Sequence, residues 1–185
     1  MARRTGTKIQ RWRVPLGFLF SAVFLLLARP EIWSLAAGGL IALVGLMIRA
    51  WASGHIRKNS VLAISGPYAH TRNPLYLGSF LLGLGFTIAA AHWWLPLVFA
   101  ALFLGVYLPV MRAEAKELIS LFGADYEKYA ESVPLFLPRP TPFRTDGASE
   151  IKFDLKLYLR YREYQAALGL VAAWCLLLLK ATLFH

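Results

Sequence analysis

Long runs of hydrophobic residues alternate with short polar segments along this chain. An α-helix needs about 20 apolar residues to cross the hydrocarbon core of a bilayer. On this basis the pattern predicts five membrane-spanning helices, over residues 14–28, 32–52, 75–91, 93–111 and 166–184. The first run is short, but Trp12 and Arg13 precede it and can lie among the lipid headgroups, which extends its reach. We therefore expect an all-α integral membrane protein with about five transmembrane helices.

The composition agrees with this interpretation. Of the 185 residues, 58% are hydrophobic and 16% are charged, whereas about a quarter of the residues of an ordinary soluble domain are charged. The hydrophobic residues are also gathered in blocks, which a soluble core does not require. The composition therefore favours a membrane protein of one compact unit.

The net charge of +10 is distributed unevenly between the connections. Five Lys or Arg residues precede the first run, three lie between residues 53 and 74, and nine lie between Arg112 and Arg162, but the connections near residues 29 and 92 hold one together. Basic loops remain in the cytoplasm, so the N-terminus is predicted to be cytoplasmic and the C-terminus to lie on the opposite side. In a bacterium this membrane would be the inner membrane. No motif for binding RNA or DNA accompanies the charge, so we expect no nucleic-acid partner.

The long cytoplasmic segment after the fourth run has local signals of its own. The fourth helix is predicted to continue to Phe122 and to end at Gly123. A short helix is predicted over residues 124–132, followed by a proline-rich extended stretch. Residues 151–164 alternate apolar and basic positions, which predicts an interfacial helix leading into the fifth span. Residues 1–140 are thus interpreted as a membrane core with a cytoplasmic motif over 112–140, and residues 141–185 as a linker, the interfacial helix and the fifth span.

Polar residues gather at the cytoplasmic ends of the predicted spans. One group lies between residues 65 and 78, where Pro74 is placed to begin a helix. Glu114 lies just beyond the fourth span, one turn before Leu118 on the same helix face. A carboxylate directed into a helix bundle is costly without a partner, so Glu114 indicates a functional site. We assign no metal ligand to the histidines of this region.

Two ordered motifs in this region resemble a known family. Residues 66–78 read GPYAHTRNPLYLG, which resembles the G-x-Y-x-x-x-R-H-P-x-Y-x-G signature of the isoprenylcysteine carboxyl methyltransferases and their bacterial and archaeal relatives, themselves related to the phospholipid methyltransferases. Residues 114–129 read EAKELISLFGADYEKY and are followed by Val-Pro and Leu-Pro pairs, similar to the E-E-x-x-L-x-x-x-F-G-x-x-Y-x-x-Y…V-P…L-P tail of that family. The resemblance covers roughly residues 49–140.

The resemblance implies an S-adenosylmethionine-dependent membrane methyltransferase that acts on a lipophilic or lipidated acceptor arriving from the bilayer. It places the cofactor contacts on Ser60, Val61, Leu62, Ala63, Tyr68, Asn73, Pro74, Leu75, Tyr76 and Glu114. These residue types suit the cofactor, because a sulfonium with an amino group is stabilised by aromatic faces and by a carboxylate.

The chain departs from the family pattern at three positions. Asn73 stands where the family usually has His, and Ala115 replaces the second Glu of the usual pair. The family's substrate-orienting Arg lies four residues before the Glu, where this chain has Val110. Arg112 lies two residues before Glu114, and we expect it to take over the orientation of the substrate.

Several functions remain compatible with these residues. O-methylation of a lipid-attached carboxylate needs no general base, whereas N-methylation of an amine-bearing lipid requires the amine to lose a proton. An NADPH-dependent sterol-type reductase and a non-catalytic membrane protein are further alternatives.

Three other residues have structural interpretations. Gly83 and Gly85 favour close helix packing over cofactor binding. Arg49 is expected to extend toward the interface or to meet Glu114 across the bundle.

Overall fold

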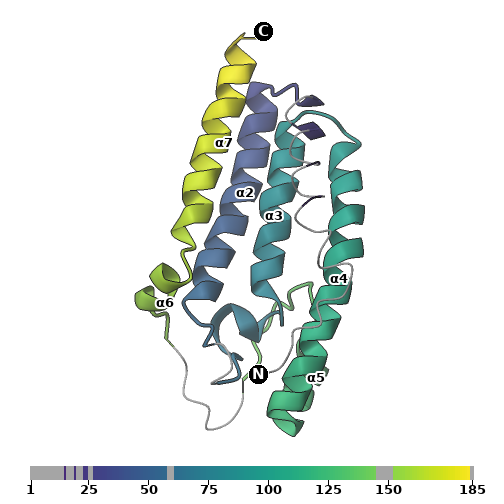
Figure 1. The fold of residues 1–185 in the computed structure, drawn as a ribbon, viewed down its shortest axis with the longest axis vertical. Helices are drawn as coiled ribbons and strands as arrows, with labels where there is room; N and C mark the ends of the chain where they lie inside the picture. The colour runs from purple at the N-terminus through teal and green to yellow at the C-terminus, as the bar shows by residue number, and fades with distance from the viewer. Residues whose placement is uncertain are drawn as a thin grey trace.

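The computed structural model describes residues 27–57, 61–144 and 152–183, together with residues 15, 19, 23 and 24. The regular elements of these residues are all helices, as Figure 1 shows. They are α2 (Ile32–Ser53), the 3₁₀ helix η1 (Gly66–Ala69), α3 (Pro74–Ala89), α4 (Leu95–Phe122), α5 (Ala124–Ser132), α6 (Leu155–Arg160) and α7 (Tyr164–Leu183). The expected all-α architecture is confirmed.

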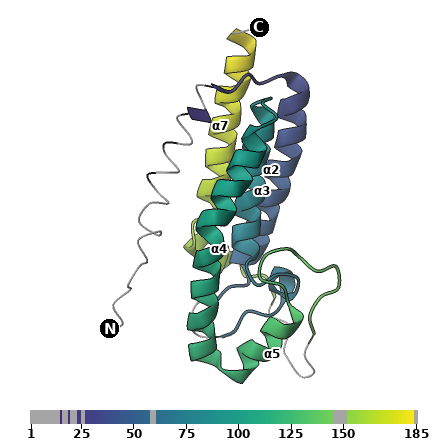
Figure 2. The ribbon, with the colours of Figure 1, turned by 90° about the vertical axis from the view of Figure 1, so that its right-hand side faces the viewer.

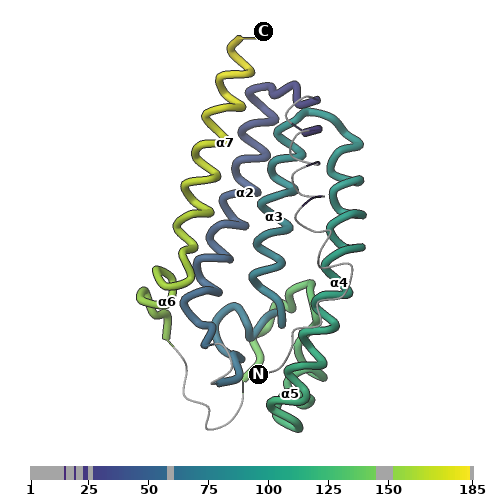
Figure 3. The backbone as a smooth tube through the Cα atoms, in the orientation of Figure 1, coloured from purple at the N-terminus to yellow at the C-terminus, as the bar shows by residue number. Residues whose placement is uncertain are grey.

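The four long helices lie side by side in the order α7, α2, α3, α4, and Figure 3 traces this arrangement. By length and composition α2, α4 and α7 can each cross a membrane, and α3 is a shorter apolar helix of 16 residues. Most of the first predicted span lies outside the described residues. The short elements η1, α5 and α6 lie toward one end of the bundle, and the C-terminus lies at the other end (Figures 1 and 2). The chain is a helical integral membrane protein.

Glycines bring α2 and α3 into close contact. A Cβ atom at Gly45 would lie 2.6 Å from the carbonyl oxygen of Gly78, and one at Gly38 would overlap the carbonyl oxygen of Gly85. Side chains at these positions would force the two backbones apart, so the small residues set the distance between the helices. A Cβ atom at Gly83 would in turn overlap the ring of Phe99 on α4. The interpretation of Gly83 and Gly85 as packing residues is therefore confirmed.

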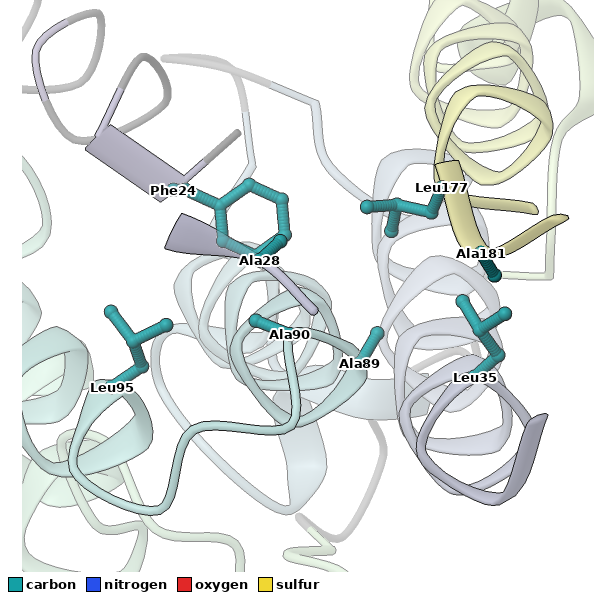
Figure 4. Packing of buried hydrophobic residues seen from close by; sticks show 8 residues of the cluster. All are labelled: Phe24, Ala28, Leu35, Ala89, Ala90, Leu95, Leu177 and Ala181. Atoms are coloured by element: carbon teal, nitrogen blue, oxygen red, sulfur yellow. The ribbon is translucent and has the colours of Figure 1, made fainter. Parts of the chain in front are cut away.

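Buried apolar side chains close the end of the bundle that lies away from α5. Eight buried residues from five segments meet there, and Figure 4 shows them from close by. They are Phe24, Ala28, Leu35, Ala89, Ala90, Leu95, Leu177 and Ala181. The backbone N–H of Arg29 donates to the carbonyl oxygen of Ala90 at 3.0 Å, which ties the two turns at this end together. The polar side chains of the two sequence motifs lie at the opposite end.

The segment after α4 agrees in part with expectation. Helix α4 continues to Phe122 and ends at Gly123, which adopts a positive φ of 52°, and α5 spans the predicted residues. The interfacial helix predicted over residues 151–164 is wrong in extent, because α6 holds six residues only. Asp154 caps its start by accepting a hydrogen bond from the N–H of Lys156, and Arg162, with φ of 55°, interrupts the helical path before α7.

The proline-rich stretch after α5 returns along the first motif. Backbone N–H groups of Arg139 and Phe143 donate to the carbonyl oxygens of His70 and Ala69, both at 2.9 Å, and the N–H of Arg72 donates to Pro134 at 3.0 Å. These bonds satisfy backbone groups that prolines leave without helical partners. The two sequence motifs are thereby joined into one structural unit.

Candidate active site

A cavity of about 600 Å³ lies where α2 ends and α3 begins. Its wall combines the last turns of α2, the loop that follows, η1, the start of α3, the second half of α4 and α5. The volume is within the range of cavities that bind small molecules and cofactors. The two motifs, which lie more than 35 residues apart along the chain, face each other across it.

The structure brings most of the residues singled out by the sequence to this cavity. Nine of the ten that the resemblance marks as cofactor contacts line it: Val61, Leu62, Ala63, Tyr68, Asn73, Pro74, Leu75, Tyr76 and Glu114. Ser60 lies outside the described residues. Arg112 is exposed on α4 and is not part of the cavity wall. The structure therefore does not bring the expected substrate-orienting residue to the site.

A hydrogen bond joins α3 and α4 within the wall of the cavity. The hydroxyl of Tyr76 donates to Oε1 of Glu114 at 2.8 Å. The ring of Tyr107, also in the wall, lies 5.3 Å from the ring of Tyr76 between centroids. The arrangement fixes one carboxylate beside the ring of Tyr76, which in turn contacts the ring of Tyr107, and a carboxylate and aromatic faces both attract a cationic group.

Asn73 holds the tail that follows α5. Its side-chain Nδ2 donates to the carbonyl oxygen of Leu135 at 2.9 Å, and its backbone N–H donates to Oγ1 of Thr71 at 3.3 Å. The hydroxyl of Thr71 donates in turn to the carbonyl oxygen of Phe136 at 2.9 Å. The residue that replaces the family's His is thus a hydrogen-bond donor that fixes the N-terminal end of α3 against the tail.

We expect Asn73→Leu to lower the free energy of unfolding by about 1–3 kcal/mol, because the carbonyl of Leu135 loses its donor in a half-buried position. Asn73→His, with a neutral imidazole, can still donate and should cost less than Asn73→Leu. Thermal unfolding of the three proteins in detergent at pH 8 measures the difference. Equal stability of the Leu variant and the native protein would contradict a structural role for this bond.

Two buried tyrosines, Tyr68 and Tyr129, are part of the cavity wall. The hydroxyl of Tyr129 donates to the carbonyl oxygen of Tyr68 at 2.6 Å. Burial raises the pKa of both phenols well above the ordinary value, and the negative charges of Glu114 and Glu163 and the phenol of Tyr161 raise the pKa of Tyr68 further. Both tyrosines therefore stay protonated at neutral pH and offer donors and aromatic faces rather than a base.

Arg72 is a wall residue that the sequence analysis did not single out. Its Nη1 donates to the hydroxyl of Tyr126 at 3.3 Å, and its guanidinium lies 5.9 Å from the centre of that ring. Its Nε is buried without a hydrogen-bond partner among the described residues. The position of Arg72 in the R-N-P run was the available signal.

Arg49 also lines the cavity, but its partner differs from both expectations. It forms an ion pair with Glu163, from the turn between α6 and α7, at 2.8 Å. It neither extends freely to the interface nor meets Glu114. Glu163 lies outside both motifs, and no sequence signal connects it to Arg49.

Comparison with known proteins identifies the family. The family model described as phospholipid methyltransferase matches residues 44–125. The cobalt-zinc-cadmium resistance protein CzcN of Cupriavidus metallidurans is 32% identical over 153 residues, which cover 77% of this chain and 69% of that protein. No solved structure matches the chain significantly.

Two relatives are named as methyltransferases. The protein-S-isoprenylcysteine O-methyltransferase of Schizosaccharomyces pombe is 31% identical over 81 residues, or 44% of this chain and 34% of that enzyme. The methanethiol S-methyltransferase of Crocosphaera subtropica is 35% identical over 72 residues, or 38% of this chain and 27% of that enzyme. Together with the helical membrane fold and the matched motifs, these similarities establish that the chain is a methyltransferase and belongs to the membrane family of the phospholipid and isoprenylcysteine methyltransferases.

Proposed function

We propose that the protein transfers a methyl group from S-adenosylmethionine to a lipophilic acceptor at the cytoplasmic face of the membrane, and that the acceptor is a carboxylate. The observation that carries the proposal is that both motifs line one cavity, with the Tyr76–Glu114 hydrogen bond between them. Membership of a methyltransferase family leaves the reductase and the non-catalytic membrane protein without support.

The residues present suit this cofactor. Glu114 and the rings of Tyr76 and Tyr107 form a site for a cationic group, as a sulfonium and an amine require. The buried Nε of Arg72 is a donor that an anionic group, such as the carboxylate of an amino acid, would satisfy. When bound, S-adenosylmethionine would supply an electrophilic methyl group, and the chain's residues would orient it and exclude water.

The chemistry of the wall favours a carboxylate acceptor over an amine. A carboxylate is ionised at neutral pH and attacks without a general base, whereas an ammonium group must first lose a proton. No histidine is present among the described residues that line the cavity. The raised pKa values of Tyr68 and Tyr129 keep these phenols protonated, so they are poor bases. N-methylation of an amine-bearing lipid would depend on Glu114 or Glu117.

Ligand titration tests the cofactor directly. Calorimetry of the purified protein in detergent should show saturable binding of S-adenosylhomocysteine and none of NADPH. S-adenosylmethionine should compete for the same site. No heat of binding at S-adenosylhomocysteine concentrations up to about 1 mM, the upper end of ordinary enzyme affinities, would refute the proposal.

The charge distribution supports the proposed orientation. The end of the bundle that carries the cavity also carries basic side chains, among them Arg57, Arg72 and Lys128, and the opposite end is closed by apolar residues. The cavity would therefore open to the cytoplasm, where a water-soluble cofactor is available. A topology reporter inserted after Gly147 should be cytoplasmic and one fused at His185 external. Both reporters on the same side would exclude this orientation.

A further inference from the structure

Arg49, a residue of the cavity wall, forms an ion pair with Glu163, which is not among the residues that line the cavity. Nε of Arg49 donates to Oε2 of Glu163 at 3.0 Å, and Nη2 donates to both carboxylate oxygens at 2.8 Å. The two side chains are 22% and 12% exposed, so solvent screens the pair only in part. The guanidinium of Arg49 therefore already binds a carboxylate, that of Glu163, in the bidentate geometry that stabilises arginine–carboxylate pairs.

The third nitrogen of Arg49 is held by α3. Nη1 donates to the hydroxyl of Ser79 and, at 3.4 Å, to the carbonyl oxygen of Leu75. A Cβ atom at Gly78 would lie 2.5 Å from Cγ of Arg49, so the glycine leaves the path for the arginine side chain. The guanidinium is fixed from one side by α3 and presents its Nε–Nη2 edge to Glu163.

Arg49 lies at the membrane end of the cavity. Ser79 is in the second turn of α3, beyond Asn73 and Tyr76, and Tyr107 lies two turns before Glu114 on α4. Arg49, Ser79 and Tyr107 all line the cavity, so its wall continues from the cytoplasmic motif into the apolar part of the bundle. A lipophilic acceptor that enters from the bilayer would reach this end first.

The residues expected to orient a carboxylate lie elsewhere or are apolar. Val110, which occupies the position of the family's arginine, is 3% exposed and carries no charge. Arg112 lies outside the wall. Arg72 lies at the cytoplasmic end, where its buried Nε suits an anionic group of the cofactor. Arg49 is the arginine that the structure places beside α3 with a carboxylate on it.

We propose that Arg49 binds the carboxylate of the lipophilic acceptor. Glu163 remains paired with the guanidinium of Arg49 until the acceptor displaces it. The inference rests on the proposed function and assigns its acceptor site. In the transfer, a lone pair of the acceptor's carboxylate oxygen forms the bond to the methyl carbon, while the bond from that carbon to the donor's sulfur breaks and its electron pair goes to sulfur. No proton moves. The methyl ester is neutral, so it loses the attraction of Arg49, and Glu163 pairs with the arginine again.

Equilibrium binding of radiolabelled palmitate to the full-length protein loaded with S-adenosylhomocysteine tests the proposal. Arg49→Gln should raise the Kd for palmitate about tenfold or more, the effect of one lost charge-assisted pair. Glu163→Gln should lower it by about threefold, because the competing carboxylate is gone while Arg49 remains. Lys128→Gln, which removes one exposed positive charge from α5, is the matched control and should change nothing.

The opposite signs separate acceptor binding from a purely structural role of the pair. If Arg49→Gln and Glu163→Gln weaken palmitate binding equally, or if Arg112→Gln rather than Arg49→Gln weakens it, the proposal is wrong. It is also wrong if the native protein binds S-adenosylhomocysteine but prefers hexadecylamine to palmitate. If Arg49→Gln does not fold, Arg49→Lys replaces it in the test. This variant keeps the positive charge but cannot form the bidentate pair, so its affinity for palmitate should lie between those of the native protein and a variant without the charge. Failure of S-adenosylhomocysteine binding in the native protein would instead refute the proposed function.

Discussion

Gly85→Leu is expected to destabilise the protein by more than about 3 kcal/mol, because the new side chain has no space between α2 and α3. A Cβ atom at Gly85 would overlap the carbonyl oxygen of Gly38 and would lie 2.7 Å from the backbone nitrogen of Ala42. These are backbone atoms, so the conflict is relieved only if the helices separate. Separation would move Arg49 away from Ser79, and S-adenosylhomocysteine binding should fall with stability.

Gly105→Leu is the matched control, because no atom lies within 4 Å of a Cβ atom at this position of α4. It should leave stability unchanged or raise it by up to about 1 kcal/mol, since leucine is a better helix former than glycine. Thermal unfolding of both variants in the same detergent, followed by intrinsic tryptophan fluorescence, measures the difference. Similar midpoints for Gly85→Leu and Gly105→Leu would show that the glycines do not set the distance between α2 and α3.

Glu114→Ala is expected to weaken S-adenosylmethionine binding by about 1.5–3 kcal/mol, or roughly 10- to 150-fold in Kd. The carboxylate is the charged member of the contact between α3 and α4, and Tyr76 holds it toward the cavity. Its loss removes a charge-assisted interaction with a cationic ligand. Calorimetric titration of the native and variant proteins at one ionic strength gives the two affinities.

Two further variants make this prediction specific. Glu117→Ala removes the same charge one turn further along α4, where the side chain also lines the cavity, and should change the Kd by less than about threefold. Tyr76→Phe removes the hydroxyl that orients Glu114, so its effect and that of Glu114→Ala should be less than additive in the double variant. A larger loss in Glu117→Ala than in Glu114→Ala would mean that the cofactor's positive charge lies closer to Glu117.

Features that depend on neighbouring residues could be predicted from the sequence. Apolar length fixes which segments can cross a membrane, and Gly123 and the residues after it define the end of α4 and the extent of α5. The resemblance identified nine residues of one cavity, and six of them lie within the two motifs. The structure places Arg112 outside the cavity wall, because at about 100° per residue it lies about 200° around the helix from Glu114, which lines the cavity.

Contacts between distant segments required the tertiary structure. Arg49 and Glu163 are 114 residues apart, and their pairing depends on the rotation of α2 and on the interruption of the chain at Arg162 before α7. The bond from Asn73 to Leu135 likewise depends on the return of the tail along the first motif. Hydrophobic periodicity predicts which residues form a helix, but the partners of its polar side chains are decided by which helices pack together and at what rotation. The sequence by itself thus determined the membrane fold and the part of the cavity that the two motifs line, and the packing of α2, α3 and the segment before α7 decided the part that holds Arg49.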